Sequence, residues 1–342
     1  MNKTKISAKI VADSISPQGD RLTSLQITFP RILLSEINTH RMLSKNTSSS
    51  RAIPFKKMVE AIENDPFIPI AWQKEHKGMQ GSEYHVDRKH ENAVYEWLKA
   101  RDYAVKQASM MNNDGITKQL CNRLLEPFMW TTMLITGSRE GWNNFFKLRC
   151  PQYYFEPEGK FYKSKKEWVN VWNATFKTGE DVSRPAKVED WDNLFWLSQN
   201  KGQAEIHMMA LAESIYDAVN ESIPKQLKAG EWHVPFIDRF ESYSDKEDGS
   251  DFDLNDIKIS VALAARTSYT IVGEEKEIDY SKMIGLHDRL IAQNPPHSSP
   301  MEHACQAVTD EEYNNSFKGQ EKGWFRNYKG FKSYRQVIEE SK

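Results

Sequence analysis

Alternating hydrophobic and polar positions predict two strands near the beginning of the chain. Residues 5–12 read KISAKIVA and residues 21–29 read RLTSLQITF. The apolar side chains of the second run share one face: Leu25, Ile27 and Phe29. Because side chains alternate between the two faces of a strand, both runs have the pattern of half-buried strands. Pro30 is expected to end the second strand, since proline has no N–H for the ladder.

Apolar positions three or four residues apart predict helices over most of the remaining chain. The expected helices are a short one after Pro30 that buries Ile32, Leu33 and Ile37, residues 54–66, residues 89–112, a segment through Ile116, Leu120 and Leu124 that stops before Pro127, residues 138–149, residues 202–222, residues 257–268, and a segment through Met283, Ile284, Leu286, Leu290 and Ile291. Strands combined with many helices in this order indicate an α+β protein.

Changes in composition divide the chain into segments. Residues 150–201 are rich in Trp and Lys and carry Pro, Gly and Asp, so we interpret them as a helical or irregular insertion. Residues 245–256 read DKEDGSDFDLND and are expected to form an exposed acidic linker. The tail at 311–342 interleaves cations with aromatic rings, as nucleic-acid contacts do, but we favour docking of the tail on its own domain.

Composition and charge exclude several classes of protein. Ten Trp and sixteen Phe among 342 residues indicate a packed globule and not a disordered chain. A net charge of −2 gives no general attraction to nucleic acid or membranes, so we expect neither as a partner. Three distant cysteines form no disulfide framework, and the N-terminal segment lacks the apolar core of a signal peptide. We therefore expect a cytoplasmic protein, with a virus-encoded protein in a host cytoplasm included.

The polar run EINTHRMLSKNTSSSRA at 36–52 is the first candidate for chemistry. Asn46, Ser49 and Ser50 are small enough to let a backbone wrap closely around a polar ligand, although capping or turn roles are the common alternative. Three arginines have forks that fit a phosphate or carboxylate, with an internal salt bridge as the alternative: Arg51, Arg123 and Arg149.

Two further groups of residues suggest chemistry at first sight. His297, Glu302 and His303 form an HxxxxEH pattern, but it does not match the metalloprotease order and implies no third ligand, so we expect no metal. Cys150 follows Arg149, which could lower the pKa of the thiol, yet a buried inert cysteine is the commoner case.

Several of these motifs together resemble the flavin-dependent thymidylate synthase family. The family signature is Arg-His-Arg-x-x-Ser-x-Asn-x-x-Ser-x-Arg, and THRMLSKNTSSSR at 39–51 is similar to it at the same spacing. The segments NRLLEP, NNFFKLR and GQAEI also resemble family motifs. AARTS at 264–268 and HSSPMEH at 297–303 match motifs that precede the signature in the cellular enzymes. The chain thus resembles a circularly permuted, phage-like member, joined at 245–256.

The resemblance implies a fold, a reaction and cofactors. The expected fold is an antiparallel sheet with long helices. Residues 1–149 would form the first part of the catalytic core, 202–244 a core helix and 257–310 the flavin-binding loops. The enzyme would transfer a one-carbon unit from 5,10-methylenetetrahydrofolate to C5 of dUMP, giving dTMP, with FAD reduced by NADPH. Family enzymes are homotetramers whose active sites are shared between subunits.

The resemblance also assigns roles to residues. Ser49 and Arg149 would be catalytic groups, with Ser49 positioning or polarising the pyrimidine. The nucleotide would contact Glu36, Ser49, Ser50, Arg51, Arg123 and Arg149. The flavin would contact His40, Arg41, Asn46, Asn144, Ser268, His297, Ser299 and Glu302.

Two departures from the family pattern leave alternatives open. Thr39 replaces the first arginine of the signature, which removes a cation near the flavin. Glu36 stands where the family usually has Gln, and a carboxylate could accept from uracil N3–H or equally from a cytosine amino group. The alternatives are a methylase or hydroxymethylase of dUMP or dCMP, methylation through Cys150, and a non-catalytic relic that binds nucleotides or nucleic acid.

Overall fold

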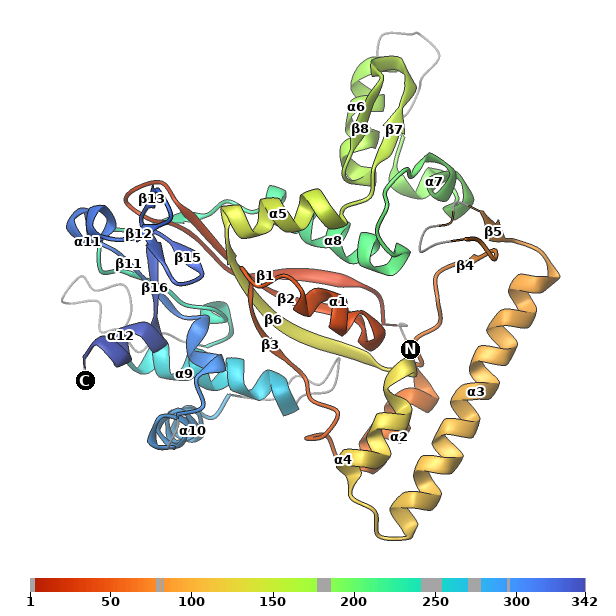
Figure 1. Ribbon diagram of the computed structural model, residues 1–342, viewed down its shortest axis with the longest axis horizontal. Coiled ribbons are helices and arrows are strands. Elements are labelled where there is room, and N and C mark those ends of the chain that lie inside the picture. Colours follow the sequence, from red (N-terminus) through yellow and green to blue (C-terminus); the bar gives the residue numbers. More distant parts are fainter. Residues whose placement is uncertain are drawn as a thin grey trace.

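A five-stranded sheet forms the centre of the computed structural model, which describes residues 4–77, 81, 83–176, 186–240, 254–269, 278–293 and 296–341. The strand order is β3-β6-β2-β1-β9. Figure 1 shows the four strands β3, β6, β2 and β1 side by side. The strands are β1 (Ser7–Ile15), β2 (Arg21–Pro30), β3 (Ser44–Thr47), β6 (Trp130–Ser138) and β9 (Lys225–Gln226). All neighbouring pairs are antiparallel except β1 and β9.

Helices cover both faces of this sheet. One face packs against the turn η1 (Arg31–Leu33) and the helices α1 (Leu34–Asn38), α5 (Arg139–Arg149) and α8 (Ile206–Glu221). The opposite face packs against α9 (Leu254–Arg266) and α10 (Tyr280–Ala292). On β6, Ile135 belongs to the first core cluster and Leu134 to the second, as the alternation of strand side chains requires.

A third cluster packs α2 (Phe55–Asn64) against α3 (Arg88–Asn113), α4 (Lys118–Cys121) and the 3₁₀ segment η2 (Asn122–Phe128). The long helix α3 runs along one side of the molecule, and the short pair β4 (Trp72–Gln73) and β5 (Tyr84–His85) precedes it (Figure 1). Ile53 and Asn122 connect this cluster to the polar run, because Asn122 Nδ2 donates to the carbonyls of Ser50 and Ile53 at 2.6 and 3.0 Å.

The segment at 150–201 has an aromatic core of its own. It contains β7 (Tyr153–Phe155), η3 (Glu156–Glu158), β8 (Lys160–Tyr162), α6 (Lys165–Phe176), η4 (Val188–Asp190) and α7 (Asn193–Gln199). Trp168 and Trp196 are buried together in this core, with ring centroids 5.5 Å apart. The segment projects from the sheet beside α8 (Figure 1). It therefore combines a hairpin with helices, while 177–185 lie outside the described residues.

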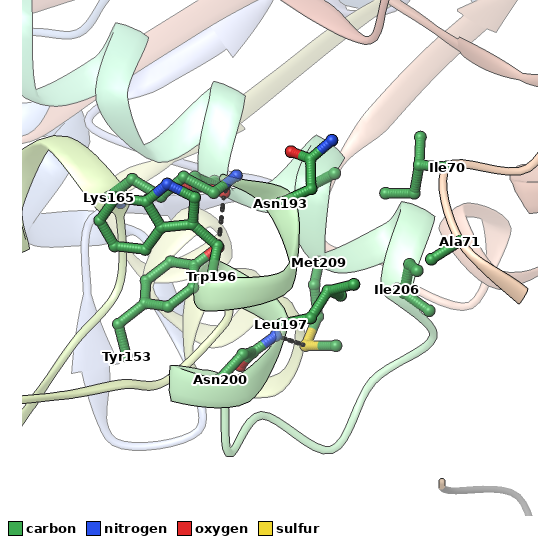
Figure 2. Close-up of a pocket in the computed structure, with 12 residues that line it drawn as sticks. Ile70, Ala71, Tyr153, Lys165, Asn193, Trp196, Leu197, Asn200, Ile206 and Met209 are labelled. Atoms are coloured by element: carbon green, nitrogen blue, oxygen red, sulfur yellow. Dashed lines mark hydrogen bonds and ion pairs between the residues drawn. The ribbon is translucent and has the colours of Figure 1, made fainter. Parts of the chain in front are cut away.

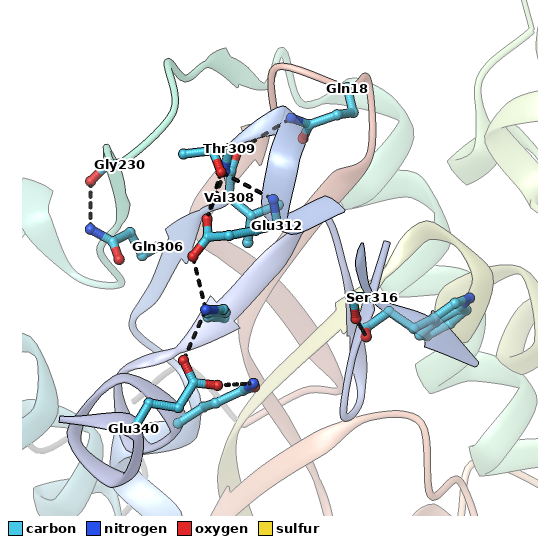
Figure 3. Close-up of polar contacts among 11 residues, drawn as sticks. Gln18, Gly230, Gln306, Val308, Thr309, Glu312, Ser316 and Glu340 are labelled. Carbon is cyan, nitrogen blue, oxygen red and sulfur yellow. Dashed lines mark hydrogen bonds and ion pairs between the residues drawn. The ribbon is translucent and has the colours of Figure 1, made fainter. Parts of the chain in front are cut away.

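The C-terminal segment packs on the rest of the chain. A small sheet joins β10 (Trp232–His233), β11 (Cys305–Ala307) and β16 (Phe331–Ser333). The remaining elements are η5 (Ile237–Arg239), η6 (Thr267–Tyr269), η7 (Ser299–Glu302), α11 (Asp310–Asn315), the hairpins β12 (Phe317–Lys318) with β13 (Glu321–Lys322) and β14 (Trp324–Phe325) with β15 (Tyr328–Lys329), and α12 (Tyr334–Glu340). Lys332 Nζ bridges Glu312 and Glu340 at 2.9 and 2.8 Å (Figure 3), and Tyr328 and Phe331 are buried.

The mixed α/β architecture with antiparallel sheets agrees with the expected class, and the long helices lie within a few residues of their predicted positions. Ile32, assigned to a buried face, is exposed instead. Exposed as well are Ile116, Leu120 and Leu124, whose spacing predicts the helix before Pro127. The segment before Pro127 is one turn of α-helix followed by a 3₁₀ segment that includes Pro127, and it buries Cys121 and Leu125. Strands β3 and β6 were not predicted.

Two predicted features fall partly outside the described residues. They are the acidic linker, of which 245–253 are not described, and the loop at 294–303, of which 294 and 295 are not described. The end of the linker, 254–256, is the first turn of α9 with Asp256 buried, so the expectation of an exposed linker is wrong for these three residues. Within the part of the chain that the structure describes, no helix is long and apolar enough to cross a membrane.

Candidate functional site

The polar run at 36–52 is an edge of the central sheet and not a solvent loop. It consists of the end of α1, a turn, strand β3 and a second turn. Lys45 pairs with Ile135 of β6, and Asn46 pairs with Leu134. Paired residues of antiparallel strands share a face, so Lys45 lies on the α5 face of the sheet and Asn46 on the α9 face.

Asn46 joins three segments that are far apart in the sequence. Its side chain is 6% exposed, and its Nδ2 donates to the carbonyl of Ala264. Its Oδ1 accepts from Ser299 Oγ at 2.9 Å and from Ser268 Oγ at 3.5 Å. The backbone N–H of Ser49 also donates to the carbonyl of Ser268 at 2.9 Å. The segments at 264–268 and 299 therefore meet the polar run at one place.

Arg149 lies in a second cluster on the opposite face of β3. At the C-terminal end of α5, its Nε donates to His40 Nε2 at 3.0 Å and its Nη1 to Glu36 at 3.2 Å. Burial, and then the charges of Arg149 and Lys45, lower the pKa of His40 to about 4. His40 is consequently neutral at pH 7, and its Nε2 accepts from Arg149, so its proton resides on Nδ1.

A third cluster centres on Glu126 at the end of η2. Its Oε1 accepts from Ser50 Oγ at 2.5 Å and from Arg31 and Arg123 at 3.5 Å each. Arg31 Nη1 also donates to the carbonyl of Ser48 at 2.6 Å. Neither Arg31 nor Glu126 was among the predicted site residues. Their signals were weak: Glu126 stands between the apolar pair and the proline of NRLLEP, and Arg31 follows Pro30 in an apolar run.

Several predicted residues are exposed and stand apart from these clusters. In the described part of the chain, no hydrogen bond or ion pair is found for the side chains of Arg41, Arg51, Asn144 and His297. Glu302, expected at the flavin, is paired with Arg335 of α12 at 2.9 Å. One chain thus divides the predicted site residues among three clusters, an exposed set and the separate ion pair of Glu302 with Arg335.

Cys150 is not placed to act as a nucleophile. Its side chain is buried in the core against α5 and α8, and burial raises the pKa of its thiol far above the usual range. Since the thiolate is the reactive form, this burial supports the inert role expected for Cys150 over the alternative of methylation through it. Lys163 has the opposite effect on this pKa, but desolvation exceeds it.

The histidines of the HxxxxEH pattern have different environments. His297 is exposed, whereas His303 is 1% exposed and its Nδ1 is 2.8 Å from Thr136 Oγ1. Burial, and then the nearby His233, lower the pKa of His303 to about 3. Among the residues that the structure describes, no three His, Cys, Asp or Glu side chains are arranged to hold one metal ion.

A pocket of about 240 Å³ lies between α7 and α8, beside Ile70 and Ala71 (Figure 2). Trp196 and Met209 contribute to its apolar wall, and Lys165 and Glu213 are its charged groups. None of the predicted nucleotide or flavin residues lines it. This pocket is therefore separate from the three clusters around the polar run.

Comparisons with known proteins identify no family for this chain. No family model matches it, and no curated protein matches it. Two solved structures of PolB, a UMP/dUMP methylase from Streptomyces cacaoi, show limited similarity. The structure with 5-Br dUMP has a TM-score of 0.36 and 13% identity, over 51% of this chain and 89% of PolB. The structure with 5-Br UMP has a TM-score of 0.36 and 14% identity, over 50% and 91%. Similarity this low assigns neither fold nor function.

Proposed function

We propose that this protein is a flavin-dependent enzyme of the thymidylate synthase kind that transfers a one-carbon unit to C5 of dUMP. The observation that supports this function best is the position of Asn46. Its hydrogen bonds join the signature-like run to Ala264, Ser268 and Ser299, in the two segments that resemble flavin-binding motifs. A circularly permuted member of the family requires these segments to meet although more than 200 residues separate them.

The nucleotide would be held by the three arginines of the polar run and its neighbouring segments. Arg51 and Arg123 are exposed cations, and Arg149 keeps Nη2 without a described partner, so each can donate to an anion. Ser50 is held by Glu126, which fixes the backbone of the serine turn. Ser49 has no neighbouring base in the described residues, so we assign it a positioning or polarising role.

The fit of the flavin to its predicted contacts is mixed. Arg41 and His297 are exposed donors that suit a cofactor with a pyrophosphate. Asn46 and Glu302 have hydrogen bonds within the chain, so they would orient the flavin-binding segments and not contact FAD through those atoms. FAD, reduced by NADPH, would supply the reducing equivalents, and methylenetetrahydrofolate the carbon. The chain's own residues would bind and orient the nucleotide and the cofactors.

Glu36 is compatible with dCMP as an alternative substrate. Its Oε2 accepts from Arg149, and its Oε1 has no described partner, so the carboxylate can accept from a cytosine amino group or from uracil N3–H. Turnover assays with dUMP and dCMP in parallel decide between them. Conversion of dUMP to dTMP without any turnover of dCMP would exclude the second substrate, and a 5-hydroxymethyl product would identify a hydroxymethylase.

We further propose a homotetramer with shared active sites. The exposed set formed by Arg41, Arg51, Asn144 and His297 has no partners within the described chain, as expected for residues completed by a neighbouring subunit. Light scattering after size-exclusion chromatography measures the mass directly. A monomer that is active at nanomolar concentration would contradict shared sites.

The first experiment is an anaerobic visible spectrum of the FAD-loaded protein. We expect NADPH to bleach the flavin, and dUMP to accelerate the bleaching. Arg149→Met should abolish the acceleration by dUMP, while Arg139→Met, an exposed arginine on the same helix, should retain it. A protein that does not retain FAD would exclude the enzyme and favour a nucleotide-binding relic, which binding of DNA with a steep salt dependence would then identify.

A further inference from the structure

Lys45 of β3 is a half-buried cation without a carboxylate partner. Its Nζ donates to the backbone carbonyl of His40, and no ion pair is found for it among the described residues. Removing a charge from water without an opposite charge is costly. Accordingly, burial lowers the pKa of Lys45 to about 8. Such a lysine in the polar run is a candidate for binding an anion from outside the chain.

Lys45 and Arg149 both donate a hydrogen bond to His40. Lys45 contacts the His40 carbonyl, and Arg149 contacts the His40 ring. This ring packs edge-on against Phe145, with ring centroids 4.9 Å apart. His40 is neutral, so the cluster holds two cations and one carboxylate, that of Glu36. The cluster therefore has one uncompensated positive charge. It is partly accessible to solvent, because the side chains of Arg149 and Glu36 are 22% and 36% exposed.

Unused hydrogen-bond donors remain on both cations. Lys45 has three N–H groups, one of which serves the His40 carbonyl, and Arg149 retains Nη2 and one N–H of Nη1. Two cations with free donors, partly removed from water, are the usual recognition elements for a phosphate oxygen.

We propose that Lys45 and Arg149 form a binding site for an anionic group of the phosphate class. The site would take the 5′-phosphate of the nucleotide if the proposed function holds, and that identification of the ligand rests on the proposed function. The anion site itself does not. Lys45 lies at an unspecified position of the signature pattern, so the motif alone does not mark it.

Binding measurements on the FAD-loaded protein test this site with three probes: dUMP, 2′-deoxyuridine and inorganic phosphate. Lys45→Met removes the charge and keeps the length of the side chain. We expect it to weaken binding of dUMP and phosphate by about ten- to a hundredfold, the loss of one charge-assisted hydrogen bond, and to leave 2′-deoxyuridine unchanged. Lys45→Arg should restore binding. Lys9→Met, an exposed lysine on β1, is the matched control.

Each outcome distinguishes the anion site from the proposed function. Equal affinity of the wild type and Lys45→Met for both anions would overturn the site, as would a wild type that binds neither anion. If phosphate binding depends on Lys45 but dUMP does not bind, the anion site stands and the nucleotide function fails.

A pH profile keeps the proposal testable if Lys45→Met does not fold. The titratable residue in contact with Lys45 is His40, from the turn, and Arg149 of α5 in turn contacts His40 and Glu36 of α1. Lys45 loses its charge as the pH rises through about 8, whereas arginine keeps its charge. The affinity of the wild type for dUMP should thus fall relative to Lys45→Arg between about pH 7 and 9. A constant ratio would overturn the proposal.

Discussion

At the scale of single residues, one carboxylate organises the serine turn. Glu126 accepts from Ser50, Arg31 and Arg123 through the same oxygen. A charged acceptor with several donors is strong, and removing it leaves those donors without a partner. The motif NRLLEP draws attention to Arg123, but the geometry identifies Glu126 as the group that holds Arg123 and Ser50 together.

We therefore predict that Glu126→Gln lowers the free energy of unfolding by about 1–3 kcal/mol, because the hydrogen bonds to Ser50, Arg31 and Arg123 lose their charged acceptor. It should also raise the KM for the nucleotide more than it lowers kcat, because the serine turn loses its anchor. Chemical denaturation and steady-state kinetics measure the two effects. Glu311→Gln, an exposed residue of α11, serves as control and should change neither. Unchanged stability in Glu126→Gln would refute the anchoring role.

At the scale of elements, one buried carboxylate contributes to the attachment of the segment at 150–201 to the core. Glu213 of α8 is 8% exposed. Its Oε1 accepts from the backbone N–H of Lys165 at 2.7 Å, and its Oε2 accepts from Tyr153 Oη at 3.1 Å and Lys165 Nζ at 3.3 Å. Glu213 thus joins the start of α6 and strand β7 to the helix that packs on the central sheet.

Glu213→Gln should loosen this attachment at a cost of about 1–3 kcal/mol, because a buried charged acceptor is lost. Glu221→Gln is the matched control on the same helix. Its partner Lys166 is exposed, so the loss should stay within about 1 kcal/mol. Chemical denaturation measures the free energy of unfolding of both variants. Equal effects of the two substitutions would mean that Glu213 is not the attachment.

Prediction of elements from the sequence succeeded where the signal was local. The helices α2, α3, α5, α8, α9 and α10 are close to their expected ranges, because an amphipathic face is visible in consecutive residues. Strand β6 has no such alternation, since both of its faces are buried and its run WTTMLITGS reads as continuously apolar or Thr-rich. Ile116, Leu120 and Leu124 have helical spacing, yet tertiary packing buries the neighbouring Cys121 and Leu125 instead.

At the scale of the whole molecule, a buried series of hydrogen bonds links the central sheet to the small sheet of β10, β11 and β16. Ser24 Oγ lies 2.8 Å from His233 Nε2 and 2.6 Å from Thr136 Oγ1, which continues to His303. Burial lowers the pKa of His233 to about 4 and that of His303 to about 3, from an ordinary value of 6.5. Both histidines are therefore neutral in the folded protein over the whole range above about pH 4.

These two histidines make stability depend on pH. Between about pH 6.5 and pH 3 the unfolded chain binds more protons at these sites than the folded chain. The free energy of unfolding is therefore highest above about pH 6.5 and decreases as the pH is lowered. Melting temperatures measured from pH 8 to 5 should decline below 6.5. His303→Gln should flatten the decline. A wild-type profile that is flat over this range, or an undiminished slope in the variant, would contradict the prediction.

The sequence by itself determined the amphipathic helices and the spacing of the polar run, because both are properties of residues close together in the chain. Only the tertiary structure decided which partners those residues take. Asn46 meets Ala264 and Ser299 across more than 200 positions, and Lys45 and Asn46 lie on opposite faces of an edge strand. Such partners depend on how the sheet and helices pack, and local periodicity contains no record of contacts at that separation.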